Sequence, residues 1–112
     1  MKTTRDFRPL SDRYTFDCGP CSGAHGFAQI DTAQDAPYYG TWCSPSARAL
    51  VCFSEGTLTT TVCETDAEFV AELRALARWN DDAGHGPMRI DARRDDALRQ
   101  AFETLGLGDL LH

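Results

Sequence analysis

Apolar and polar residues alternate in short runs over the first 63 positions, the period-two pattern typical of β-strands with two different faces. After position 63 the apolar residues recur every three or four positions, which is the spacing of one face of an α-helix. The chain therefore predicts strands first and helices second. The segments that we expect to form strands are 13–17, 26–32, 38–43, 49–54 and 57–63.

The two clearest strands are joined by Glu55-Gly56, a two-residue loop in which glycine can take a positive φ. A loop this short sets the register of the hairpin, so we expect Phe53 to lie opposite Leu58. The preceding hairpin is expected to close at 44–47.

That second hairpin would place Trp42 opposite Ala49, and the two registers together define two faces of the sheet. One face is apolar enough to predict the core: Tyr38, Trp42, Val51, Phe53, Leu58 and Val62. The other face is mixed: Tyr39, Thr41, Cys43, Arg48, Leu50, Cys52, Thr57, Thr59, Thr61 and Cys63.

Two helices are signalled in the second half of the chain. Thr65 and Glu68 form a capping-box pattern, and the helix that they begin is expected to end at Gly84. Asp91 is expected to cap a second helix that ends before Gly106. The apolar stripes are Phe69, Leu73, Leu76 and Ala77 in the first helix and Leu98, Phe102 and Leu105 in the second.

These elements predict an α+β fold, an antiparallel meander of about four to five strands followed by two C-terminal helices packed on one sheet face. The chain of 112 residues is expected to form a single domain, with residues 1–12 as its flexible part. No apolar run reaches the length of a membrane span, and Met1–Leu10 lacks the apolar stretch of a secretory signal. We therefore expect a cytoplasmic protein.

The net charge of −6 is concentrated in the second half of the chain. Residues 1–48 hold five basic and five acidic side chains, whereas residues 49–112 hold six arginines and twelve acids. Such a surface repels the phosphate backbone of nucleic acids, which disfavours DNA or RNA as a partner. A protein partner with a basic surface is compatible with it.

Cys18-Gly19-Pro20-Cys21 has the CGPC sequence of thioredoxins, but its surroundings do not fit their fold. Only 17 residues precede Cys18, too few for the βαβ unit of about 30 residues that would come before it. Two glycines follow within five residues of Cys21, where a thioredoxin needs a helix. The motif is more typical of an irregular connection between strands.

The alternative chemistry is zinc binding, with Cys18, Cys21 and His25 in a CxxCxxxH spacing and Cys43 as a fourth ligand. The weakness of this hypothesis is that the sequence has no second closely spaced pair of cysteines to complete the four zinc ligands. The residue types of a cysteine-based catalytic triad also occur, in Cys21, His25 and Asp31, but closeness in sequence gives no geometry. The familiar phosphate-loop, zinc-protease and serine-hydrolase motifs are absent, which favours a protein that is not an enzyme.

One segment resembles a known group of proteins. The stretch 26–42, GFAQIDTAQDAPYYGTW, is similar to small proteobacterial proteins of unassigned activity that are associated with plasmids or prophages. The resemblance extends to the closing segment 105–111. It implies a bacterial accessory protein of a mobile element.

We therefore expect a small acidic protein-binding module, an accessory or inhibitor protein, that presents carboxylates to a basic partner. The candidate contact residues are Tyr39, Leu50, Asp81, Asp82, Asp95 and Asp96. A homodimer that buries the mixed sheet face is a second arrangement. The alternative function is zinc binding or thiol redox chemistry at the CGPC motif, and otherwise we expect no cofactor.

Overall fold

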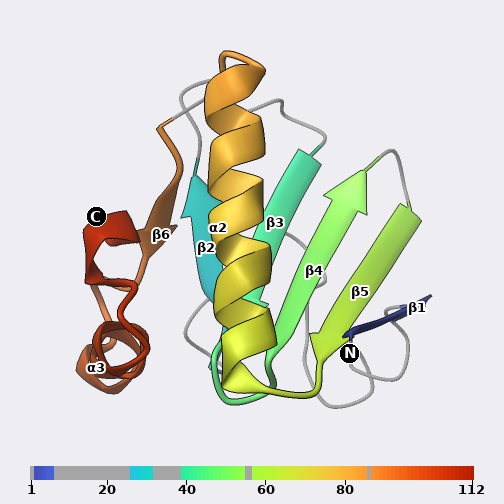
Figure 1. Ribbon diagram of the computed structural model, residues 1–112. Helices are drawn as coiled ribbons and strands as arrows, with labels where there is room; N and C mark the ends of the chain where they lie inside the picture. Colours follow the sequence, from blue (N-terminus) through green and yellow to red (C-terminus); the bar gives the residue numbers. More distant parts are fainter. Residues whose placement is uncertain (1, 7–25, 32–38, 55–56, 86) are drawn as a thin grey trace.

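The computed structural model describes residues 2–6, 26–31, 39–54, 57–85 and 87–112 of the chain (Figure 1). It has the expected α+β class. The elements are β1 (Lys2–Asp6), β2 (Ala28–Asp31), β3 (Tyr39–Ser44), β4 (Ala49–Ser54), β5 (Thr57–Cys63), α2 (Asp66–Asp82), β6 (Arg89–Asp91), α3 (Asp96–Thr104) and the 3₁₀ turn η1 (Gly108–Leu110).

The six strands form one antiparallel sheet in the order β1-β5-β4-β3-β2-β6. Its centre, β2 to β5, is the expected meander. The two edge strands were not predicted: β1 falls in the charged segment that we expected to be flexible, and β6 is only three residues long. The expected strand 13–17 lies outside the described residues.

The register of the β4–β5 hairpin is as predicted, with Phe53 paired to Leu58. The β3–β4 hairpin differs by two residues, because β3 continues to Ser44 and Trp42 pairs with Val51 instead of Ala49. The turn therefore spans residues 45–48 instead of 44–47, and it holds Arg48 at φ 51, in the left-handed region. A shift of two residues leaves every side chain on its original face, so the two predicted faces survive the correction.

The helices cover the face of the sheet that we expected to be mixed. Helix α2 runs across this face (Figure 1), and the buried cluster beneath the helices contains Cys43, Cys63, Phe69, Leu73 and Phe102. A second cluster lies on the opposite face and contains Phe27, Trp42, Ala49 and Val51. Both faces are therefore buried in part. The mixed face can be core because a cysteine that is not ionised packs as a small apolar side chain.

The first helix begins where the capping pattern predicts. Thr65 is the N-cap of α2 and its Oγ1 accepts a hydrogen bond from the backbone N–H of Glu68 at 3.1 Å. The second helix starts later than expected, because Asp91 lies in β6 and its carboxylate is bound by Arg93. Asp95 is the N-cap of α3 instead, with its Oδ1 accepting the N–H of Leu98 at 3.0 Å.

Candidate functional site

The cysteines give no metal site within the part of the chain that the structure describes. Cys18, Cys21 and His25 lie outside it, and the described residues contain no cluster of three or more metal-binding side chains. Cys43 is fully buried in the core, and this burial raises the pKa of its thiol well above the ordinary value. Its surroundings thus favour the neutral thiol over the thiolate that zinc binds.

The sheet residues proposed for partner contact differ in position. Tyr39 is the first residue of β3. Leu50 is half-buried and packs against the cluster beneath the helices. We had expected Leu50 on an open face of the sheet, and this was wrong because α2 covers that face.

Two of the four acidic candidates lie at the N-terminus of a helix and two at the C-terminus of another. Asp95 and Asp96 lie at the start of α3, where the helix dipole is positive and carboxylates are favourable. Asp81 and Asp82 are the last residues of α2, where the dipole is negative and no basic residue stands in the last turn. A charge of the wrong sign costs about 0.3–1 kcal/mol at such an exposed end. Asp81 and Asp82 therefore lower the stability of this end of α2.

Trp79 precedes these two carboxylates by two and three residues in α2 and is 59% exposed, the one large apolar side chain among the described residues that is left open to solvent. The sequence reasoning missed it. The buried positions of α2 are Phe69, Leu73 and Asn80, with Leu76 half-buried between them. Asn80 continues the helical spacing of these buried positions, so Trp79 lies outside the apolar stripe. A tryptophan outside the stripe of an amphipathic helix was the sequence signal that could have identified it.

The orientation of Trp79 is set by the way α2 ends. Gly84 has φ +80, its N–H donates to Asp81 O at 3.1 Å, and the N–H of His85 donates to Asn80 O at 2.7 Å. This pair of hydrogen bonds is the glycine C-cap that turns the chain back over the last turn of a helix. The ring of His85 consequently packs on Trp79, with centroids 5.6 Å apart and planes at 37°. We call Trp79, Asp81, Asp82 and His85 the α2-end patch.

A cavity of about 440 Å³ lies at the other end of α2, between α3 and the turn that joins β3 to β4. Its apolar side includes Pro45, Leu98, Ala101 and Leu105. Its polar side includes Ser46 and the carboxylates of Asp66 and Asp95, which stand at the starts of the two helices.

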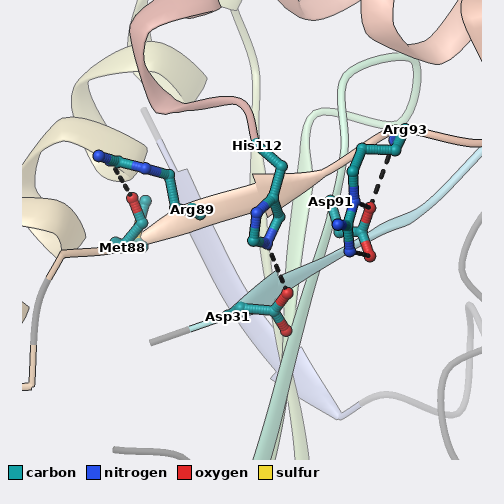
Figure 2. Close-up of polar contacts among 6 residues, drawn as sticks. All are labelled: Asp31, Met88, Arg89, Asp91, Arg93 and His112. Atoms are coloured by element: carbon teal, nitrogen blue, oxygen red, sulfur yellow. Dashed lines mark hydrogen bonds and ion pairs between the residues drawn. The ribbon is translucent and has the colours of Figure 1, made fainter. Parts of the chain in front are cut away.

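A third polar cluster joins the end of the chain to the β2–β6 edge of the sheet (Figure 2). His112 Nε2 lies 2.8 Å from Asp31 Oδ2, and Arg93 Nε lies 3.0 Å from Asp91 Oδ1. The N–H of His112 also donates to Ile90 O at 3.1 Å. Each carboxylate in this cluster has a partner, so the cluster serves to attach residues 111–112 to β6. Asp31, named above in a triad with Cys21 and His25, contacts His112.

No helix of the described residues is long and apolar enough to cross a membrane. Asp66 and Asp109 form surface ion pairs with Arg48 and Arg74. Asp81 and Asp82 form no ion pair with the described part of the chain. Asp81 and Asp82, like Asp96 and Glu103 of α3, are therefore available to an outside cation.

Searches of protein-family models, of curated proteins and of solved structures found no match to this chain. The function must therefore be argued from the site itself.

Proposed function

We propose that this protein is a small acidic binding module that recognises a basic protein partner through the α2-end patch. The observation that carries the proposal is the exposure of Trp79, 59%, in the last turns of α2, which end in two carboxylates that the helix dipole disfavours. Residues that lower local stability and have no structural role are expected at functional positions.

The chemistry of the patch suits a protein contact. Tryptophan is enriched at the energetic centres of interfaces, because its large ring buries much apolar surface at little cost in conformational entropy. His85 holds one side of the Trp79 ring in place before any partner arrives. Asp81 and Asp82 would attract a basic surface and speed its approach. Recognition needs no covalent step, in keeping with a protein that is not an enzyme.

The setting of this module is part of the same proposal. We propose an accessory or inhibitor protein of a mobile element, acting in the cytoplasm of a bacterium, on the sequence resemblance of segment 26–42 alone. A second copy of the chain is a poor occupant of the patch, because Asp81 and Asp82 would face their own counterparts across a symmetric interface.

The test is affinity capture from a bacterial extract with the full chain and three variants. They are Trp79→Ala, the double variant Asp81→Asn/Asp82→Asn, and Glu103→Gln, which removes an exposed acid of α3 far from the patch in sequence. Wild type and Glu103→Gln are expected to retain the same basic protein. Trp79→Ala should weaken the Kd of the purified pair by about 30-fold, the effect of losing about 2 kcal/mol at an interface centre.

Tryptophan fluorescence supplies a second readout. The chain has two tryptophans, and Trp42 is buried, so binding should shift the emission of Trp79 alone. The double asparagine variant should bind more slowly and lose most of the salt dependence. Capture that is unchanged by Trp79→Ala, capture of acidic proteins, or a stable homodimer in sedimentation would overturn the proposal.

Zinc or thiol chemistry at Cys18 and Cys21 remains a hypothesis from the sequence alone, because no described residue adds to it. Elemental analysis of the purified protein, together with an insulin-reduction assay on Cys18→Ser, decides it. Bound zinc would support the first form of the hypothesis and thiol-dependent reduction the second.

A further inference from the structure

The indole ring of Trp79 is held on one side and open elsewhere. The His85 ring packs on it with centroids 5.6 Å apart and planes at 37°, and Trp79 is still 59% exposed. Figure 1 shows the C-terminal turn of α2 extending past the ends of β3 and β4. A supported aromatic ring at such an end is a platform on which a flat group of a partner can stack.

Asp82 lies on the same face of α2 as Trp79, nearly one turn further along. Residues three positions apart in a helix are neighbours, with Cβ atoms about 5–6 Å apart. The N–H of Ala83 donates to Trp79 O at 2.9 Å, so the helical geometry continues through this turn. Helical Cα–Cβ bonds tilt towards the N-terminus, which brings the Asp82 carboxylate back towards the Trp79 ring. Asp81 is only two positions from Trp79 and does not face it.

The carboxylate of Asp82 has both oxygens available to a donor from outside. It forms no hydrogen bond or ion pair with the described part of the chain. The local charge is negative, because Asp81 and Asp82 outnumber Arg78, the nearest basic residue of α2. The negative end of the helix dipole adds about half an elementary charge of the same sign. Dipole and side chains therefore both favour a cation here.

We propose that the α2-end patch receives an arginine side chain of the basic partner, an inference that rests on the proposed function. The guanidinium group stacks on the open surface of Trp79 and donates two hydrogen bonds to the carboxylate of Asp82. A guanidinium is planar, stacks on aromatic rings and binds both oxygens of one carboxylate at once. The ammonium of lysine is also attracted to a ring, but it is a point charge that cannot stack or form this paired contact.

The first test is an NMR titration of the ¹⁵N-labelled full chain with the peptide acetyl-Ala-Ala-Arg-Ala-Ala-amide. We expect shifts of the Trp79 indole N–H and of the amides of Asp82 and Ala83. Matched peptides carry lysine, or citrulline, which has the planar shape of arginine without its charge. The lysine peptide should bind about 3-fold more weakly and the citrulline peptide about 5-fold, as expected for weak exposed contacts. Equal binding of the three peptides, or no shift at Trp79, would overturn the inference.

The second test uses two adjacent acids as variant and control. Asp82→Asn and Asp81→Asn each remove one negative charge from the last turn of α2, but only Asp82 shares a face with Trp79. Asp82→Asn should weaken the arginine peptide about 4-fold, the effect of losing an exposed ion pair. Asp81→Asn should weaken it less than about 2-fold, because it removes only screened general attraction. Equal effects would contradict the paired contact with Asp82.

Failure of this inference can be told apart from failure of the proposed function. If capture of a basic partner depends on Trp79 while the arginine peptide binds no better than the lysine peptide, the proposed function stands and the arginine contact does not. If the arginine peptide binds as expected but no captured protein depends on Trp79, the patch binds arginine and the proposed function is wrong.

Discussion

Replacing Gly84 with alanine is expected to lower the free energy of unfolding by about 1 kcal/mol and to loosen the α2-end patch. Gly84 stands just after α2 with φ +80, a conformation that residues with a Cβ rarely adopt. Its position lets the N–H of His85 reach Asn80 O, and this hydrogen bond brings the His85 ring to Trp79. The substitution therefore tests a link between backbone conformation and the proposed binding surface.

The magnitude comes from two opposing effects. A side chain in the left-handed region costs roughly 1–2 kcal/mol. Alanine also restricts the unfolded chain relative to glycine, which returns about 0.4–1 kcal/mol. A Cβ at Gly84 would meet no atom within 4 Å, so no steric term is added. The net loss of about 1 kcal/mol corresponds to a Tm lower by about 4 °C for a chain of 112 residues.

Urea denaturation of wild type, Gly84→Ala and Gly84→Asn measures this effect. Asparagine tolerates the left-handed region better than alanine does, so Gly84→Asn should lose clearly less stability. Acrylamide should quench Trp79 more strongly in Gly84→Ala, because the His85 ring no longer covers one side of it. If Gly84→Ala is as stable as wild type and its quenching is unchanged, the glycine C-cap does not control the patch and the reasoning is refuted.

Three further outcomes are expected. A maleimide should label the exposed Cys52 in the native protein but reach Cys43 only after unfolding, since burial raises the pKa of the Cys43 thiol; peptide mass mapping would reveal rapid native labelling of Cys43 as a contradiction. The hydrogen bond from Arg74 lowers the pKa of Asp109, so the stabilisation from this pair is complete above the unfolded pKa and is lost as the pH falls through the folded one. Acid denaturation of Asp109→Asn should lack this component, which for an exposed pair is worth less than about 1 kcal/mol, and an unchanged acid limb would contradict it. Leu73→Ala should cost about 2–5 kcal/mol in urea denaturation, because Leu73 is fully buried on the side of α2 that packs on the core, and a loss below about 1 kcal/mol would place it outside the core.

Local signals in the sequence were sufficient to predict most of the strands and helices. The two-residue loop Glu55-Gly56 determined the β4–β5 register, because a loop of that length allows few alignments. Thr65 and Gly84 determined the ends of α2, because each satisfies backbone groups within its own turn of helix. Asp91 misled the prediction of α3, since an aspartate followed by Arg93 can form a turn of its own before Asp95 begins the helix.

The candidate sites depend on contacts between segments that are distant in the sequence. The cavity requires Asp66 of α2 and Asp95 of α3 to meet the β3–β4 turn, and His112 meets Asp31 across 81 positions. No short motif encodes such pairs, because their geometry follows from how the helices pack on the sheet.

What the sequence determined by itself was the period of each segment, its caps and its turns, because these depend on neighbours within a few residues. Only the tertiary structure decided which face of the sheet the helices cover. The alternation of apolar and polar residues defines two faces of the sheet but not which of them is buried. Cysteine and threonine cost little free energy whether they are buried or exposed. The exposure of Trp79 was decided in the same way, because the packing of α2 turns Phe69 and Leu73 inward and leaves the next face of the helix in water.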